Sequence, residues 1–295
     1  MLSILIPTFN YTIFPLVEVV FLQCKSLSIE FEIICIDDGS TLFHKENLEI
    51  NKLENCHYSI LEKNSGRSAI RNLLAQKAKF NWLLFLDADV FIDNPNFISN
   101  YVNCIDNQIK IVNGGIKYQK EKPKKEFLFR WIYGVKRESK SKVERDKNVY
   151  LSFLTLNFLI HKSIFKLVSF NETIPNLRHE DTLFSYDLMK SKIAIQNIHN
   201  EVIHNGLDSF EIAIKKENNS LIALKYLLDN QLLDSNYLKL ATIYVKIKSL
   251  KLDSLVSLFY RIFGKMICKN LSGFYPSLFL FDLYRISYFC NLNQK

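Results

Sequence analysis

The sequence lacks the patterns of disulfide-rich, zinc-binding and membrane-spanning proteins. Its six cysteines are scattered, without a C-x-x-C pair or regular spacing, which argues against a zinc site and a disulfide framework. No apolar run reaches the roughly 18 to 20 residues of a spanning helix, because Arg261, Lys265, Lys269 and Arg285 interrupt the richest part. The first apolar run stops at Pro7, so no signal sequence is expected. We therefore expect a cytoplasmic protein with reduced, buried thiols.

The composition is that of a globular protein whose positive charge is unevenly distributed. Apolar residues make up 48% and charged residues 23% of the 295 positions, which excludes the disordered class. The formal net charge is +8, and two regions carry the excess. Residues 117–147 hold twelve Lys or Arg against five acids, and residues 241–295 hold eight against two. Such clusters suit a phosphorylated ligand or an acidic membrane surface, although ordinary solvated lysines give the same pattern.

The first third of the chain alternates between expected strands and expected helices. Four short apolar runs, three of which contain β-branched residues, favour buried strands. These runs are Leu2 to Ile6, Glu32 to Ile36, His57 to Leu61 and Trp82 to Leu86. Apolar residues at helical spacing lie between them, from Phe14 to Ser26 and from Gly66 to Ala78. Strand, helix, strand, helix predicts a parallel sheet and an α/β fold.

The rest of the chain predicts a further strand, a basic loop and a helical region. We expect a strand at Ile109 to Val112 and, in the basic stretch 117–147, a loop with some helix. Aromatic side chains of that stretch are expected to pack it onto the sheet, or to stack on sugars; they are Tyr118, Phe127, Phe129, Trp131 and Tyr133. Helical spacing prevails from about residue 210. We therefore expect an α/β domain over residues 1–210 and a C-terminal helical appendage over residues 211–295.

Polar residues follow each of the four predicted strands. In open α/β sheets, ligands bind outside the carboxyl ends of the strands. The residues at these ends are Pro7-Thr8-Phe9-Asn10, Asp37-Asp38-Gly39-Ser40, Lys63-Asn64-Ser65-Gly66-Arg67 and Asp87-Ala88-Asp89. The sequence thus predicts that four strand ends converge on one polar rim.

Asp87 and Asp89 follow the most apolar of these strands. Carboxylates are costly to bury unpaired, and they are typical ligands of a hard divalent ion. We expect Mn²⁺ or Mg²⁺ here, where it would offset charge as a nucleoside diphosphate leaves. The alternative is that one aspartate caps a turn and the other is solvated. The apolar run before them, and the later acidic pair Glu180-Asp181, weigh against that alternative.

Two other strand ends suit a nucleotide and its diphosphate. Asp38 can accept a hydrogen bond from a base N–H, with Gly39 permitting a tight turn, although a simple turn is the competing explanation. The third strand end offers close backbone approach and positive charge at a helix start, as diphosphate binding requires. Its candidate residues are Asn64, Gly66, Arg67 and Arg71.

Five short motifs occur in order along roughly residues 1–210. They are I-P-T-F-N (6–10), I-D-D-G-S (36–40), N-S-G-R-S-A-I-R-N (64–72), L-D-A-D (86–89) and H-E-D-T-L-F (179–184). This ordered set resembles the inverting family 2 glycosyltransferases. The resemblance implies the GT-A fold, which is a Rossmann-like mixed sheet flanked by helices.

The resemblance also implies roles for the residues in these motifs. The nucleotide sugar would contact Pro7, Thr8, Phe9, Asp38, Asn64, Gly66, Arg67, Arg71, Asp87 and Ala88. Asp89 would be the chief ligand of the ion, with Asp87 divided between ion and ribose. In related transferases a late histidine can be a further metal ligand, which suggests His204, although a lone histidine is more often structural. Asn157 lies in a segment that resembles the acceptor-side strand of the family, and the alternative role for its side chain is to pair backbone groups.

Asp181 is the expected catalytic base. Inversion by direct displacement needs a base to take the proton from the acceptor hydroxyl as it attacks the anomeric carbon. Glu180 is adjacent and would hold the acceptor, or exchange roles with Asp181. Both residues also suit the start of a helix, so capping alone is the structural alternative.

The expected reaction is sugar transfer from a nucleoside diphosphate sugar, with a UDP-sugar favoured, to a carbohydrate or lipid-linked acceptor. The basic C-terminal helices suggest peripheral contact with a membrane. Nucleic acid is not an expected partner, since no motif accompanies the positive charge. A nucleotidyltransferase is disfavoured because P-T-F-N replaces a Gly-rich loop after the first strand. A non-catalytic membrane-associated scaffold with a transferase-like core is the remaining alternative, and the retained aspartates weigh against it.

Overall fold

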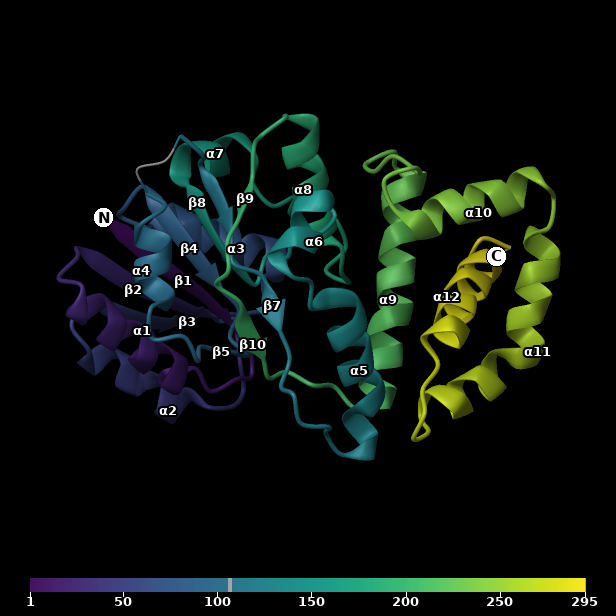
Figure 1. Cartoon of the computed structure of the whole chain (residues 1–295), viewed down its shortest axis with the longest axis horizontal. Coiled ribbons are helices and arrows are strands. Elements are labelled where there is room, and N and C mark those ends of the chain that lie inside the picture. Colours follow the sequence, from purple (N-terminus) through teal and green to yellow (C-terminus); the bar gives the residue numbers. More distant parts are fainter. Residues whose placement is uncertain (106–107, 295) are drawn as a thin grey trace. The chain divides into compact units, whose positions relative to one another are not determined.

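The computed structural model describes residues 1–105 and 108–294, which divide into two compact units (Figure 1). The sheet unit contains Met1–Gln119, Glu138–Glu172 and Glu180–Gly206. The helical unit contains Lys120–Arg137, Thr173–His179 and the chain from Leu207 onward. Each unit is therefore assembled from segments that are distant in the sequence.

Within the described residues, the sheet unit is built on a seven-stranded sheet in the order β3-β2-β1-β4-β8-β6-β9. Its strands are β1 (Leu2–Thr8), β2 (Phe31–Asp37), β3 (Cys56–Ile60), β4 (Trp82–Leu86), β6 (Ile111–Asn113), β8 (Asn157–His161) and β9 (Gln196–Asn197). β1 runs parallel to β2 and β4, and β2 runs parallel to β3, which confirms the predicted parallel core. β8 runs antiparallel to both β4 and β6. The sheet is therefore mixed, as expected for the predicted fold class.

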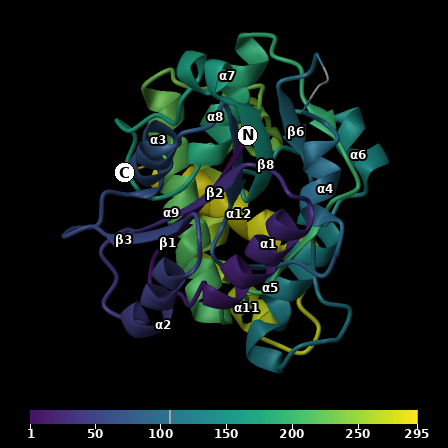
Figure 2. The ribbon, with the colours of Figure 1, turned by 90° about the vertical axis from the view of Figure 1, so that its left-hand side faces the viewer.

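Alternation along β1 divides the core between the two faces of the sheet. Ile4 and Ile6 belong to one buried cluster, and Leu5 belongs to the other. This is the period of two that a strand covered on both faces requires. Helices α1 and α4 contribute to the first cluster, whereas α3 and α8 contribute to the second (Figure 2).

The helices of the sheet unit have the following bounds. They are α1 (Phe14–Ser26), α2 (His44–Leu48), α3 (Arg67–Lys77), α4 (Phe97–Val102), α6 (Lys142–Lys147), α7 (Lys162–Leu167) and α8 (Glu180–Lys190), with the short 3₁₀ helix η1 (Glu49–Lys52). Helix α1 has the bounds expected from its periodicity, and Pro15 at its first turn suits a helix start. α8 begins with Glu180 and Asp181, so both acids occupy its first turn.

A small second sheet brings late residues beside Asp89. Within the described ranges it has three strands in the order β5-β10-β7, with bounds β5 (Val90–Phe91), β7 (Ile116–Lys117) and β10 (Val202–His204). β10 runs antiparallel to β5, and His204 pairs with Val90. Because Val90 directly follows Asp89, this register places His204 next to Asp89.

The helical unit is formed largely by the C-terminal helices. Its elements are η2 (Lys125–Phe127), α5 (Leu128–Tyr133), α9 (Phe210–Asp229), α10 (Lys239–Ser249), α11 (Asp253–Leu271) and α12 (Leu278–Leu292). The short π-helix η3 (Gly134–Glu138) follows α5, and its last residue belongs to the sheet unit. Phe129 of α5 packs against Phe210 of α9 and Phe281 of α12. Tyr133 also packs on Phe281. The expectation that these two rings pack onto the sheet is therefore wrong; they complete the core of the helical unit.

None of the helices in the described residues is long and apolar enough to cross a membrane.

Candidate active site

A pocket of about 180 Å³ lies at the carboxyl ends of β1 and β4 and the start of α3. Most of the residues expected to contact the nucleotide sugar line it: Pro7, Thr8, Phe9, Asp38, Arg67, Arg71, Asp87 and Ala88. Asp89, expected to bind the ion, also lines it, together with Tyr11 and Ile70. Phe9 exposes about half of its surface, 53%, which leaves the ring accessible for stacking. The hydroxyl of Thr8 is buried, and within the described residues it has no hydrogen-bond partner. These features suit an aromatic base and a polar ligand.

Asn64 and Gly66 do not line the pocket; they hold Asp38, which does. The backbone N–H of Ser65 and its hydroxyl donate to Asp38 Oδ1 at 2.6 and 2.7 Å, and the N–H of Gly66 donates to Asp38 Oδ2 at 3.0 Å. The Asn64 side chain donates to the Asp38 carbonyl oxygen. Gly39, at φ +76°, allows this approach, since a Cβ there would lie 2.9 Å from the Asn64 nitrogen. The orientation of Asp38 is thus set by the loop before α3.

Arg71 joins the acidic groups of two segments. Its Nη2 donates to Asp87 Oδ1 at 2.7 Å, and its Nη1 lies 3.8 Å from Glu180 Oε1. Arg67 Nη1, one turn earlier on α3, donates to the same Glu180 oxygen at 3.2 Å. Burial raises the pKa of Asp87, the Arg71 charge opposes that rise, and Asp89 adds to it. Glu180, expected near the acceptor, is therefore held by both arginines.

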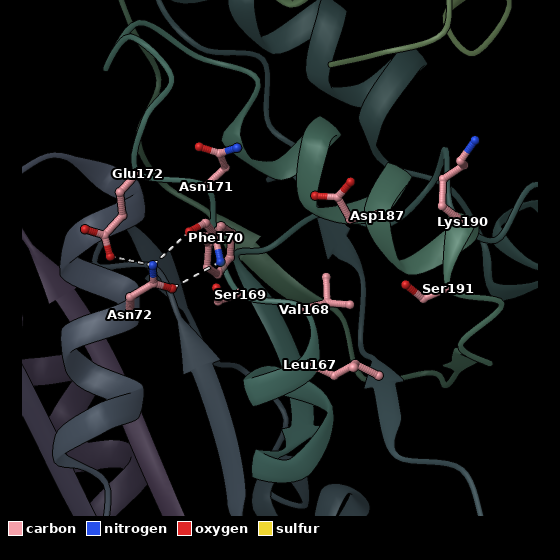
Figure 3. A pocket seen from close by; sticks show the side chains of 10 residues that line it. All are labelled: Asn72, Leu167, Val168, Ser169, Phe170, Asn171, Glu172, Asp187, Lys190 and Ser191. Carbon is pink, nitrogen blue, oxygen red and sulfur yellow. Dashed lines mark hydrogen bonds between the residues drawn. The ribbon is translucent and has the colours of Figure 1, made fainter. Parts of the chain in front are cut away.

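The Phe170 ring lies against the Arg71 guanidinium, and Phe170 also lines a second hollow, which Figure 3 shows. The Arg71 guanidinium lies 5.4 Å from the centre of the Phe170 ring. Asn72, the next residue of α3, accepts a hydrogen bond from the Phe170 N–H at 3.1 Å and donates to its carbonyl oxygen at 2.8 Å. The hollow, of about 600 Å³, is also lined by Asp187, whose pKa is raised by burial. None of the residues to which the sequence analysis gave a role in binding or catalysis lines this hollow, and Asn72 at its edge holds Phe170.

Asp89 lies between His204 and the backbone that follows it. Asp89 Oδ2 is 3.3 Å from His204 Nε2, and the N–H of Asn205 donates to the Asp89 carbonyl oxygen at 2.8 Å. A Cβ on Gly206 would come within 2.2 Å of Asp89 Oδ2, so a side chain at this position would have to displace the Asp89 carboxylate. Tyr11 lies close enough for the Asp89 charge to add to the rise that burial causes in its pKa. Tyr11 and Gly206 were not singled out by the sequence, although each adjoins a predicted site segment.

The Asp89 and His204 atoms fit a divalent ion. Neighbouring ligands of an octahedral ion at about 2.1 Å are about 3.0 Å apart, close to the 3.3 Å observed. The site has five carboxylates and only two guanidinium groups, those of Arg67 and Arg71. The carboxylates are those of Asp38, Asp87, Asp89, Glu180 and Asp181. A bound cation would therefore reduce the repulsion between the carboxylates. Among the described residues no three His, Cys, Asp or Glu side chains gather around one point. The protein would thus supply two ligands, which suits an ion that keeps positions for diphosphate oxygens and water.

Asn157 pairs backbone groups at the base of the small sheet. Its buried side chain donates to the carbonyl oxygens of Gly115 and Asn200 at 2.9 and 2.8 Å, and it accepts from the Tyr101 hydroxyl at 2.7 Å. Gly115 precedes β7 and Asn200 precedes β10. Asn157 therefore fixes the strand that carries His204, in agreement with the structural reading of this residue.

Asp181 is oriented by its own helix. Its Oδ1 accepts hydrogen bonds from the Thr182 N–H at 2.7 Å and the Thr182 hydroxyl at 3.3 Å. Its charge also acts on Arg67. The two neighbouring acids therefore have different surroundings, with Glu180 held by arginines and Asp181 by its threonine neighbour.

The fold and this site define a class of protein: the mixed sheet flanked by helices, with the C-terminal helices α9–α12, is GT-A-like. Over its whole length the chain superimposes on 88% of the mannosyltransferase PcManGT from Pyrobaculum calidifontis, in complex with GDP-Man and Mn²⁺, with a TM-score of 0.57 and 10% identity. It superimposes likewise on 92% of S. aureus TarS 1-349 in complex with UDP-GlcNAc, with a TM-score of 0.51 and 18% identity.

Sequence comparison identifies the family. Residues 3–168 match the model of glycosyl transferase family 2. An uncharacterized glycosyltransferase of Haemophilus influenzae (strain ATCC 51907 / DSM 11121 / KW20 / Rd) is 28% identical over 199 residues, which are 64% of this chain and 72% of that protein. The chain belongs to glycosyltransferase family 2, and it is a transferase that uses a nucleotide-sugar donor.

Substituting Gly206→Ala tests the packing around Asp89. The added methyl group would displace the Asp89 carboxylate, so we expect affinity for Mn²⁺ to fall by at least about tenfold. Thermal melting with increasing Mn²⁺ measures this change. Asn205→Ala is the control, because it adds no atom and keeps the backbone N–H that binds Asp89. If Mn²⁺ raised the melting temperature of both variants equally, the result would contradict the prediction.

Substituting Arg71→Lys tests the shared ion pair. Lysine lacks the planar fork that reaches Asp87 and Glu180 together, so we expect a loss of about 1–3 kcal/mol in the free energy of unfolding. Arg67→Lys should cost under about 1 kcal/mol, since Arg67 is 48% exposed whereas Arg71 is 6% exposed. Urea unfolding measures both values. Similar losses in the free energy of unfolding of the two variants would contradict the prediction that Arg71 stabilises the fold more than Arg67 does.

Proposed function

We propose that this protein is an inverting, metal-dependent glycosyltransferase that moves a sugar from a nucleoside diphosphate sugar, with a UDP-sugar favoured, to a hydroxyl of a glycan or lipid-linked acceptor. One observation carries the proposal. Asp38, Arg71 and Asp89, from two different strand ends and a helix, line a single pocket. Glu180 and Asp181 are tied to that pocket through Arg67.

In this proposal the pocket binds the donor by its separate chemical parts. Phe9 stacks on the base, and Asp38, fixed by Ser65 and Gly66, accepts from a base N–H. Thr8 supplies a hydroxyl that the folded chain leaves without a partner among its described residues. Arg67 lies at the start of α3, where its charge and the helix N-terminus both favour a diphosphate.

Asp89 and His204 would hold Mn²⁺ or Mg²⁺, with Asp87 turned toward Arg71 and the ribose. The ion would neutralise charge on the diphosphate as it leaves. Support comes from the mannosyltransferase of similar fold, whose structure contains GDP-Man and Mn²⁺.

Asp181 acts as the base in this proposal. Its carboxylate takes the proton of the acceptor hydroxyl while the acceptor oxygen bonds to the anomeric carbon, and the bond from that carbon to the diphosphate breaks on the opposite side. Glu180 is less suited to this role, because its oxygen is already engaged by Arg67 and lies near Arg71. Glu180 instead keeps the two arginines in place.

We further propose that the enzyme works in the cytoplasm, with peripheral contact to a membrane through its basic C-terminal helices. All six cysteines are unpaired, which suits a reducing compartment. A membrane-bound acceptor would be consistent with lipid-linked glycan or polysaccharide assembly.

Substituting Asp89→Asn tests the metal-dependent reaction. With Mn²⁺ and a panel of UDP-, GDP-, CDP- and dTDP-sugars, the natural protein should release nucleoside diphosphate from one donor, and the variant should lose that release. Asp93→Asn is the matched control, because Asp93 is paired with Lys117 and does not line the pocket. If no donor raises the melting temperature of the natural protein, with or without metal, the enzymatic proposal is wrong. The alternative of a non-catalytic scaffold is then favoured.

Comparing Asp181→Asn with Glu180→Gln assigns the base. We expect Asp181→Asn to reduce turnover by about 10²–10⁴-fold while leaving donor affinity near normal. Glu180→Gln should instead weaken donor affinity, because it releases Arg67 and Arg71. Isothermal titration with the donor gives affinity, and nucleoside diphosphate release gives turnover. Asp187→Asn, six residues further along the chain, controls for the loss of a carboxylate, and the reverse pattern would make Glu180 the base.

A further inference from the structure

Helix α11 of the helical unit has an apolar face that the rest of the described chain leaves exposed. Leu255 is 64% exposed, Ile262 59% and Met266 61%. Leu258, between them, is also exposed. Single exposed apolar residues are common on protein surfaces, but a continuous row of large ones marks a binding surface. We call this row the outer face of α11.

The outer face is separate from the face that stabilises the fold. At about 100° per residue, Leu255, Ile262 and Met266 fall within about 40° of one another around the helix axis. The residues of α11 that are buried lie on the opposite side; they are Ser257, Gly264, Ile267 and Leu271. That side meets α12, where Ile267 and Leu271 join the core with Phe281 and Tyr284. Since α11 is already fixed by one apolar side, its second apolar side is available to a partner.

Positive charge borders the outer face. Residues 239–271, which span α10 and α11, hold seven Lys or Arg against one acid, Asp253. Lys265 and Lys269 are exposed and lie beside the apolar row on α11. On α10, Lys246 and Lys248 are exposed as well. Apolar side chains flanked by lysines on one helix side are typical of a helix that lies in a membrane interface.

The positive charge beside the outer face distinguishes between two possible partners, a second copy of the chain and a lipid bilayer. A second copy of the chain would bring the same excess of positive charge against this face, and like charges oppose such an interface. A bilayer that contains anionic lipids offers both an apolar interior and negative headgroups. The helix need not span the bilayer, because an interfacial helix buries its apolar side only about 5–10 Å deep.

We infer that the outer face of α11 docks on an anionic membrane surface, with Leu255, Leu258, Ile262 and Met266 entering the interface and Lys265 and Lys269 contacting lipid headgroups. This specifies the membrane contact proposed above by residue. It does not depend on the transfer reaction, since donor binding and turnover are measured without lipid.

Vesicle sedimentation of the full chain tests the inference. The natural protein should sediment with vesicles of equal parts phosphatidylcholine and phosphatidylglycerol, and at least about tenfold less with pure phosphatidylcholine. The double variant Leu255→Asp/Ile262→Asp should lower binding to the mixed vesicles by at least about tenfold. Lys265→Gln and Lys269→Gln should each lower it about fivefold, and added salt should weaken binding.

Control variants carry the same changes elsewhere. Leu22→Asp alters a leucine of α1 that is 60% exposed, and Lys45→Gln alters an exposed lysine of α2. Both should bind vesicles as the natural protein does, and circular dichroism should show that all variants are folded. Donor-dependent nucleoside diphosphate release should be unchanged in the α11 variants, so a failed docking inference remains distinct from a failed transferase proposal.

Three outcomes would overturn the inference. Binding of the Leu255→Asp/Ile262→Asp variant at the natural level would show that the apolar row does not enter the membrane. Equal binding to neutral and anionic vesicles would show that Lys265 and Lys269 do not bind anionic headgroups. A dimer in light scattering that dissociates in the same double variant would make a second copy of the chain the occupant.

Discussion

The interaction on which the site depends is the pairing of Arg71 with Asp87 and, through the same guanidinium, its approach to Glu180. These acids come from segments more than ninety residues apart, and several carboxylates meet where the strands end. Carboxylates brought this close repel one another unless cations lie between them. A buried arginine can serve two of them at once because its donors form a rigid fork. Phe170 supports that fork, and Asn72 fixes Phe170 by two backbone hydrogen bonds.

The need to hold several carboxylates close together also explains the positions of Gly39 and Gly206 and of the small sheet. Asp38 accepts hydrogen bonds from the N–H groups of the loop before α3, which can approach only because Gly39 has no side chain. Asp89 is directed toward His204 by the β5–β10 pairing, and Gly206 leaves room for its carboxylate. Each of these acids is therefore held by a hydrogen bond or an ion pair, and Asp87 and Glu180 share Arg71.

Much of the fold could be predicted, because local patterns report local structure. Trp82–Leu86 and Phe14–Ser26 have the predicted bounds, and the four predicted strands pair in parallel. The position of Phe129 could not be predicted, because an aromatic residue in a basic stretch is compatible with either core. Asn64 and Gly66 show the same limit at the site. Their spacing suggested contact with the nucleotide, whereas their hydrogen bonds go to Asp38.

By itself the sequence determined the strand and helix pattern, the polar strand ends and the ordered motifs of the family, because each depends on residues close together in the chain. The tertiary structure decided which distant groups meet. His204 reached Asp89 through an antiparallel pairing that no sequence period encodes, and Glu180 reached Arg67 and Arg71 because the fold brings the first turn of α8 to α3. Such contacts depend on strand order and on the close packing of side chains from separate segments, which local sequence patterns do not specify.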